Sequence, residues 1–258
     1  MSILLASIVL LFFFLILFIL AICVHYGRKF GRKQLEKSNA KKLEVLTVAE
    51  SAVFGLLGLL VAFTFAGAYD RYEHRKLHIL HEADAFSAAY EYADLVPAKF
   101  QPALHSEIQR YLDMYIQMYR DIPNMYQVRQ DYIASLKVQH DIWKTTIDAS
   151  ANNTALAQLI IPAMKEMFDT AHDGINLTRL HPPGIIFLLL IGLAALGAYL
   201  VGYTSAENSQ KNSIHIWSYV LLTAFTIYVI LNLEFPRIGF IRFNSFDEIL
   251  VDARQNMK

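Results

Sequence analysis

Long uncharged stretches alternate with polar ones along this chain and indicate where it crosses a membrane. Residues 3–24 carry no charged side chain, and three more apolar stretches follow at 48–69, 184–203 and 214–235. Each stretch is close to the ~20 residues that a helix needs to cross the ~30 Å hydrocarbon core. Aromatic side chains lie at the ends of these stretches, as is typical of the lipid–water interface. The pattern predicts an integral membrane protein with four transmembrane helices.

The first apolar stretch differs from a cleaved signal peptide in three respects. No basic segment precedes it, its apolar run is longer than the ~7–15 residues of a signal peptide, and no small-residue cleavage site comes before the basic residues that follow it. We therefore expect residues 3–24 to remain in the protein as its first transmembrane helix.

Polar residues 70–181 separate the second and third apolar stretches and show helical periodicity. Prolines, the polar segment 148–154 and the sequence HPPG at 181–184 predict where the helices end. No segment alternates with period two, so the predicted class is all-α with a helical extramembrane domain at 70–181. Apolar residues recur on three faces at intervals of three, four or seven residues: Leu104, Ile108, Tyr111, Tyr115 and Met118; Val128, Tyr132, Leu136, Trp143 and Ile147; Leu156, Ile160, Met164, Met167, Ala171 and Ile175.

The second apolar stretch leads into a charged segment with no helix breaker between them. The sequence AYDRYEHRKLHILHEADAF at 68–86 contains neither glycine nor proline, so we expect the second transmembrane helix to continue into the polar domain. The predicted order is transmembrane helix 3–24, basic linker 25–47, transmembrane helix 48–69, helical domain 70–181, transmembrane helices 184–203 and 214–235, and C-terminal tail 236–258.

The basic linker predicts the orientation of the chain in the membrane. Residues 25–47 hold seven basic and two acidic side chains. By the positive-inside rule the linker faces the cytoplasm, which places the domain at 70–181 outside. Basic residues near the other membrane ends weaken this contrast: Arg71, Arg75, Lys76, Arg179, Arg237 and Arg242.

Composition and motifs argue against several classes of function. The net charge is zero, so we expect no nucleic-acid partner. The single cysteine, Cys23, allows no intrachain disulfide and no cysteine-based zinc or iron–sulfur site. The sequence contains no nucleophile-elbow, HExxH or glycine-rich phosphate-binding motif. We therefore expect no enzymatic activity and no cofactor.

Two groups of residues have the chemistry of metal ligands. His74, His78 and His81 lie on one face of the expected helix, with Glu82 beside them. A solvated or intersubunit face accounts for these histidines equally well. Thioether ligands for copper are available at Met114, Met118 and Met125, although methionines among tyrosines more often pack in a core. We assign no metal to either group.

Small residues on the second transmembrane helix suggest close helix packing. Gly58, Ala62 and Ala66 form one ladder of small residues at intervals of four, and Ser51 and Gly55 form another. The third transmembrane helix carries a similar ladder at Ala194, Ala198 and Gly202. Such ladders serve either packing within one four-helix unit or a subunit interface or pore wall. Bulky Phe63 and Phe65 on the second helix are candidates for a hydrophobic pore constriction.

Three blocks of sequence resemble the bestrophin-like family of prokaryotic membrane proteins. The blocks are FTFAGAYDRYEHRKLHILHEADAFSAAYEYADLVP, LHPPGIIFLLLIGLAALGAYLVGY and LNLEFPRIGFIRF, and they cover most of residues 48–243. The stretch AYDRYEHRKL is also similar, more distantly, to the end of the pore-forming second helix of bestrophin channels. The residues that match the family pattern are Glu82, Asp84, Glu234, Pro236, Arg237 and Gly239.

The resemblance implies an ion channel or pore rather than an enzyme. Bestrophins are oligomeric anion channels with their large helical domain in the cytoplasm, so the resemblance implies the orientation opposite to that of the charge rule. It also implies a homo-oligomer in a bacterial inner membrane that conducts small ions along the second helix. Charges on one face of that helix would then line a vestibule: Arg71, Arg75, His78 and Glu82. The alternative is a non-conducting membrane protein whose helical domain binds a partner or ligand and signals through the second helix.

Overall fold

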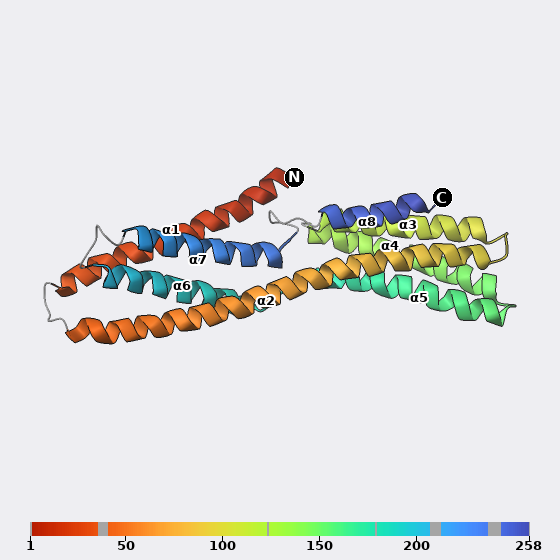
Figure 1. Cartoon of the computed structure of the whole chain (residues 1–258). Coiled ribbons are helices and arrows are strands. Elements are labelled where there is room, and N and C mark those ends of the chain that lie inside the picture. The colour runs from red at the N-terminus through yellow and green to blue at the C-terminus, as the bar shows by residue number, and fades with distance from the viewer. Residues whose placement is uncertain are drawn as a thin grey trace. The chain divides into compact units, whose positions relative to one another are not determined.

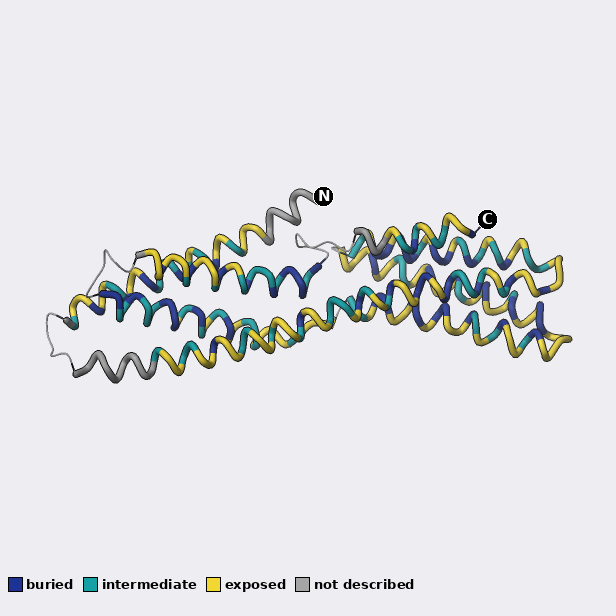
Figure 2. The backbone as a smooth tube through the Cα atoms, in the orientation of Figure 1, coloured by how far each residue is buried: buried dark blue, intermediate teal, exposed yellow. Residues whose placement is uncertain are grey.

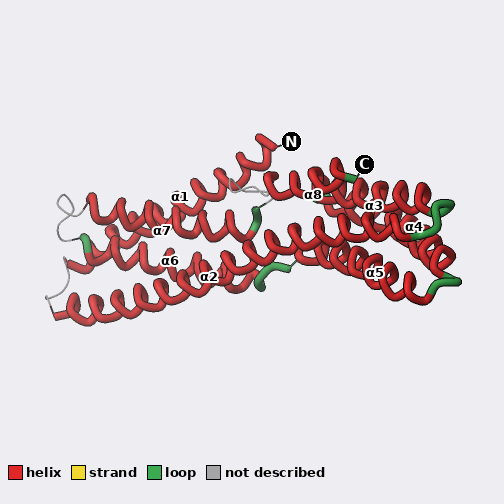
Figure 3. Tube along the Cα trace, turned by 45° about the vertical axis from the view of Figure 1, so that its right-hand side comes forward, coloured by secondary structure: helices red, strands yellow, loops and turns green. Residues whose placement is uncertain are grey.

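The computed structural model describes residues 2–35, 41–122, 124–178, 180–206, 213–236 and 244–257, which form only helices and their connections (Figure 3). The α-helices are α1 (Ser2–Leu35), α2 (Lys41–Tyr92), α3 (Gln101–Asp121), α4 (Met125–Ser150), α5 (Thr154–Leu177), α6 (Gly184–Thr204), α7 (Ser213–Glu234) and α8 (Asn244–Asn256), with a 3-10 helix at Ala93–Leu95. Helices α1, α2, α6 and α7 are long and apolar enough to cross a membrane. The predicted all-α class with four membrane helices is confirmed.

The chain divides into two compact units. The membrane unit comprises Met1–Arg71 and His181–Ile241, and the helical unit comprises Tyr72–Leu180 and Arg242–Lys258. Helix α2 is unbroken from Lys41 to Tyr92 and contributes to both units (Figure 1). The charged stretch at 70–86 therefore continues the same helix that begins in the apolar stretch before it.

Glycines allow α1 and α6 to pack closely in the membrane unit. A Cβ atom on Gly202 would lie 2.2 Å from the carbonyl oxygen of Val24, and one on Gly27 would lie 2.1 Å from that of Tyr199. Both distances are far below van der Waals contact, so any side chain here would force the two backbones apart. The small residues predicted on the third transmembrane helix are therefore used for packing within the chain, and all three are buried: Ala194, Ala198 and Gly202.

Aromatic and aliphatic side chains from α2, α3, α4 and α5 form the core of the helical unit. Phe86, Tyr111 and Tyr115 are fully buried or nearly so, and Tyr111 and Tyr115 share a hydroxyl–hydroxyl contact of 3.3 Å. Burial raises the pKa of Tyr115 to about 12, so this hydroxyl stays protonated in the core. The apolar faces predicted for α3 and α5 are buried along their whole length.

Asparagine caps mark two helix starts that the sequence pattern predicted. The side-chain oxygen of Asn124 accepts from the backbone N–H of Gln127 at the start of α4, and that of Asn153 accepts from Leu156 at the start of α5. Each cap satisfies a backbone N–H that has no partner within its helix. The breaks expected near Pro123 and at 148–154 therefore coincide with the ends of α4.

The buried face of α4 differs from the apolar face seen in the sequence. Ser135, Val138, Ile142 and Thr146 point into the core, and the hydroxyls of Ser135 and Thr146 bond to carbonyls of their own helix. Bonding in this way lets small polar side chains replace apolar ones in a core. Most of the apolar face noted in the sequence is instead exposed: Leu136, Trp143 and Ile147. Figure 2 shows exposed positions in yellow and buried ones in dark blue alternating along the helices.

Candidate functional site

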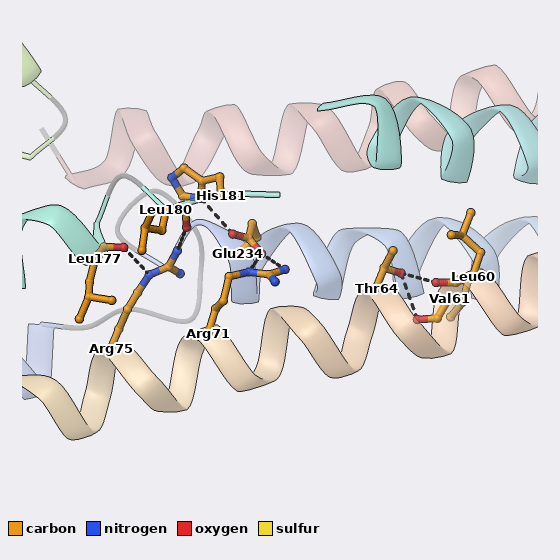
Figure 4. Close-up of polar contacts among 9 residues, drawn as sticks. All are labelled: Leu60, Val61, Thr64, Arg71, Arg75, Leu177, Leu180, His181 and Glu234. Carbon is orange, nitrogen blue, oxygen red and sulfur yellow. Dashed lines mark hydrogen bonds and ion pairs between the residues drawn. The ribbon is translucent and has the colours of Figure 1, made fainter. Parts of the chain in front are cut away.

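A buried carboxylate at the end of α7 accepts hydrogen bonds from an arginine and a histidine side chain. The Glu234 side chain is 0% exposed. Its Oε2 accepts from Arg71 Nε at 2.9 Å and from Arg71 Nη2 at 2.7 Å, while its Oε1 accepts from His181 Nδ1 at 2.9 Å (Figure 4). These bonds join three segments of the membrane unit: α2, the connection before α6, and α7. We call these three residues the Arg71–Glu234–His181 cluster.

The sequence around each residue explains why it reaches the cluster. Arg71 comes directly after the apolar part of α2, where a long charged side chain can turn toward a partner near the membrane end. Pro182 and Pro183 hold His181 outside α6, which begins at Gly184. The ring of His181 packs on Phe235, with the ring centroids 4.5 Å apart. Helix ends therefore position His181 and Glu234, whereas Arg71 projects from within the continuous helix α2.

Burial makes the pairing of Glu234 obligatory rather than optional. A carboxylate removed from water is costly unless it is paired and hydrogen-bonded. Arg71 supplies two N–H donors to one carboxylate oxygen and His181 supplies a donor to the other, so both oxygens are satisfied. Since the carboxylate only accepts hydrogen bonds, His181 donates through Nδ1. The cluster connects α2 to α7 at the end of the membrane unit.

A small cavity of about 210 Å³ lies beside the cluster within the membrane unit. Helices α2, α6 and α7 line it with apolar side chains and the Arg71 guanidinium. Thr64 also lines it, but its hydroxyl bonds back to the carbonyl oxygens of Leu60 and Val61 (Figure 4). Arg71 is therefore the polar end of an otherwise apolar space.

Arg75 closes the end of α5 in the helical unit. Its Nη2 donates to the carbonyl oxygen of Leu180 at 2.8 Å, and its Nε donates to that of Leu177 at 3.3 Å (Figure 4). The last carbonyls of a helix have no partner within it, and a cation there also interacts favourably with the helix dipole. Arg75 is buried, so its charge serves this helix end rather than solvent.

Glu82 lies in the core of the helical unit against three neighbours. Tyr119 donates to its Oε2 at 2.6 Å. His78, one turn earlier on α2, places Nε2 2.8 Å from the carbonyl oxygen of Thr170. Gly174 makes room for all of them, because a Cβ atom there would lie 2.0 Å from the Tyr119 hydroxyl and 3.0 Å from Glu82 Oε2.

These contacts correct the expectation that four charged residues of α2 line a vestibule. Arg75 and Glu82 are buried inside the helical unit, and Arg71 is held by Glu234 in the membrane unit. His78 is partly buried and bonds to α5. The face of α2 that carries them points into the chain. Among the α2 residues whose burial is described, the exposed acidic and histidine side chains are Asp70, His74, His81, Asp84 and Glu91.

The candidate metal ligands are separated by their contacts. His78 bonds to the Thr170 carbonyl, while His81 lies 3.5 Å from Glu166 and His74 is exposed. Met118 is fully buried in the core, whereas Met125 is 41% exposed. Among the residues that the structure describes, no three His, Cys, Asp or Glu side chains are grouped as a metal site requires.

The outer face of α2 in the membrane unit is bare. Gly55, Gly58, Ala62 and Ala66 are exposed, and a Cβ atom on either glycine would meet nothing within 4 Å. Of the membrane-length segment of α2, 11% is buried inside the chain, against 22%, 22% and 28% for the segments in α1, α6 and α7. The ladder of small residues on α2 therefore packs against no other described part of the chain.

Phe63 and Phe65 lie on opposite flanks of this bare face. Residues two apart on a helix differ by about 200° in direction. Phe63 is 69% exposed and shares its flank with Asp70, seven residues later, whereas Phe65 is 42% exposed and shares its flank with Gly58. One helix can therefore direct only one of the two phenylalanines toward a given axis.

Comparison with known proteins assigns the chain to a family. A model of the bestrophin-like domain matches residues 13–244. The chain belongs to the bestrophin-like family. A comparison with curated proteins found no match.

Solved structures share the fold of this bestrophin-like chain. A bacterial bestrophin homologue from Klebsiella pneumoniae, carrying a point mutation, superposes with a TM-score of 0.66 at 12% identity, covering 96% of this chain and 98% of that one. Another structure, described as a membrane protein with a point mutation, gives a TM-score of 0.60 at 13% identity and covers 97% of both chains. At these identities the likeness concerns the fold alone.

Residues of the family pattern meet in the cluster. Glu234 comes from the closing block of the pattern, and it binds Arg71 and His181 from the two blocks before it. Pro236, two residues further on, is buried, while Asp84 is exposed on α2. Arg237 and Gly239 lie outside the described residues. Arg71 and Glu234 are 163 residues apart, so the sequence pattern could not predict that they pair.

Proposed function

We propose that this bestrophin-like protein forms a homo-oligomeric ion channel in the bacterial inner membrane, with α2 of each copy lining the path. It acts on small ions and catalyses no reaction. A single four-helix unit filled with leucine and phenylalanine closes its own centre, so a water-filled path needs several copies. The bare face of α2 is the observation that carries the proposal.

A contact between α2 and a neighbouring copy of the chain requires small residues to be exposed on α2. In lipid no hydrophobic effect drives helices together, so close packing at glycine and alanine supplies much of the attraction. Gly55, Gly58, Ala62 and Ala66 leave space that nothing in the chain fills. A neighbouring copy of the chain is the occupant that we propose, since a ring of identical subunits repeats one head-to-tail contact between two different surfaces.

The helical unit independently exposes an apolar stripe. Ile133, Leu136, Trp143 and Ile147 follow at intervals of three to seven residues on α4 and are 37–53% exposed. Lipid accounts for apolar faces on membrane helices, but an aqueous domain gains nothing from such a stripe unless another surface covers it. A second copy is the occupant that we propose, because it would extend the same assembly beyond the membrane.

The Phe63 flank of α2 has the better chemistry for the wall of a path. Phe63 is the more exposed phenylalanine, and Asp70 follows on the same flank at the membrane end. A ring of phenylalanine side chains constricts a path by excluding water, and a ring of carboxylates attracts cations to its mouth. The Arg71–Glu234–His181 cluster would keep α2 fixed to α7 while its outer face surrounds the path.

Reconstitution of the purified protein in liposomes tests the proposal. We expect flux of small ions above that of protein-free vesicles, together with a mass above that of one chain in mild detergent and in crosslinked membranes. A folded, stable monomer, or an oligomer that passes no small ion, would contradict the channel. The second outcome would favour a non-conducting protein that signals through α2.

A further inference from the structure

A second cavity in the membrane unit contains an arginine. Its volume is about 230 Å³. Ala21, Val24, His25 and Arg28 line it from α1, and Ile216, Trp217 and Val220 line it from α7. It shares no residue with the cavity beside Arg71.

The guanidinium of Arg28 has donors that no described residue satisfies. Its Nε and Nη2 atoms are buried, and neither has a hydrogen-bond partner within the described part of the chain. Arginine stays charged in proteins, so these donors cannot be neutralised by losing a proton. Buried donors without partners are costly, and more so when they carry charge. No acidic side chain is among the described residues that line the cavity, so an acceptor must come from outside them.

We propose that this cavity binds a phosphate group through Arg28 and His25. The planar guanidinium presents two parallel N–H donors, which match the oxygens of a phosphate. His25, one turn before Arg28 on α1, adds a ring nitrogen to the same cavity. The remaining lining is apolar or aromatic, which excludes water and strengthens the charge-assisted bonds.

The position of the cavity along α1 is that of a membrane phosphate layer. Arg28 follows Val24, the last residue of the uncharged stretch, by four residues, or about 6 Å of helix rise. Trp217 is half-exposed at the cavity, in the manner of aromatic side chains at the lipid–water interface. Apolar Ile214 and Leu221 on the same helix are exposed to the surroundings. A phospholipid and free phosphate both supply the required group.

Lipid titration of purified protein tests the proposal and distinguishes the two sources. The delipidated protein is titrated with phosphatidylglycerol in mixed micelles, with an uncharged detergent of equal chain length, and separately with inorganic phosphate, while Tm is recorded. We expect Tm to rise with phosphatidylglycerol but not with the uncharged detergent. In Arg28→Gln the half-saturating concentration should increase roughly tenfold or more, since one charge-assisted contact is lost. If Tm rises with inorganic phosphate but not with phosphatidylglycerol, the site binds free phosphate instead of lipid.

Two controls make the result specific. Arg32→Gln removes the same charge from an exposed position one turn later on α1 and should respond like the wild type. Without phosphate or lipid, Arg28→Gln should be at least as stable as the wild type, because it removes unsatisfied donors. Equal responses of Arg28→Gln and the wild type to both ligands would overturn the proposal. So would a loss of Tm in Arg28→Gln in the absence of phosphate and lipid, since Arg28 would then already have a partner within the chain.

Discussion

Arg71 on α2 holds the fully buried carboxylate of Glu234 on α7 with two N–H donors, across 163 residues of sequence. Both donors converge on the same oxygen, and His181 takes the other. The contact fixes the inner face of α2 at the membrane end. It leaves the outer face, with its glycines, alanines and Phe63, uncovered.

Breaking this pair should destabilise the membrane unit strongly. Arg71→Met removes the arginine partner and its two N–H donors from a buried carboxylate, so we expect a loss of roughly 3–5 kcal/mol. The double variant Arg71→Met with Glu234→Leu should recover much of that loss, because it removes the buried charge together with its partner. Thermal unfolding in detergent, analysed as a double-mutant cycle, measures both effects. A double variant as unstable as the sum of the two single variants would contradict the pairing.

An exposed ion pair on the same helix provides the control for this experiment. Lys76 lies 3.5 Å from Glu73, and both side chains are about one-third exposed. Exposed pairs contribute roughly 0–1 kcal/mol. Lys76→Met should therefore change the unfolding temperature little under the conditions in which Arg71→Met lowers it.

Gly174 should tolerate no side chain. In Gly174→Ala the new Cβ would lie 2.0 Å from the Tyr119 hydroxyl, so this hydroxyl must move away from Glu82. We expect a loss of about 1–3 kcal/mol for the displaced hydrogen bond on a buried carboxylate. Denaturant unfolding followed by circular dichroism measures it. Gly192→Ala is the control, since nothing lies within 4 Å of its Cβ position and helix propensity alone favours alanine over glycine. It should cause no loss, and a similar loss there would show that the close contact with Tyr119 is not the cause.

Substitution of Glu107 by glutamine should raise Tm in a pH-dependent manner. Burial raises the pKa of the Glu107 carboxyl above the usual 4.5; a hydrogen bond with Thr145 partly opposes this rise, and the charge of Asp141 adds a smaller increase. A raised folded-state pKa favours the protonated form, so this contribution is present below pH 4.5 and lost as the pH rises through the folded-state pKa. Glu107→Gln should therefore raise Tm at pH 7, by an amount that shrinks toward pH 4.

Glu91→Gln controls for the loss of one negative charge. Glu91 is exposed on α2, so its substitution should leave Tm nearly unchanged at both pH values. A Tm gain for Glu107→Gln that persists undiminished at pH 4 would show that the carboxyl of Glu107 is not the source.

Cysteine labelling decides the orientation of the chain. The basic linker 25–47 predicts that Ser38 faces the cytoplasm and that the 151–153 turn between α4 and α5 lies outside. Single cysteines at Ser38 and Ala151, in a Cys23→Ser background, are treated in intact cells with an impermeant maleimide. We expect labelling at position 151 only. Labelling at position 38 only would reverse the topology and match the cytoplasmic helical domain implied by the bestrophin resemblance.

The sequence predicted most of the helical architecture because its signals are local. Uncharged stretches of bilayer length identify the membrane helices, and prolines and the polar segment 148–154 mark where helices end. The absence of glycine and proline after Gly67 predicted that α2 runs on. Each of these signals depends on neighbouring residues alone.

Other features escaped the sequence because they depend on distant partners. The charged residues of α2 resemble a solvated face until α5 supplies carbonyls for Arg75 and α3 supplies Tyr119 for Glu82. The stripe with Leu136 and Trp143 resembles a core face, yet the core side of α4 uses self-bonded Ser135 and Thr146. An apolar stripe at helical spacing has the same pattern in a core and in an interface between copies.

Ion flux through Phe63→Ala and Phe65→Ala proteins in liposomes tests most directly the claim that α2 lines the path. The two variants remove the same side chain from opposite flanks of one bare helix face, so they differ in direction rather than in chemistry. We expect Phe63→Ala to assemble as the wild type does and to increase flux, because a hydrophobic constriction is widened. Phe65→Ala should leave flux unchanged. Equal flux in Phe63→Ala and wild-type oligomers would contradict the proposed path along the Phe63 flank of α2.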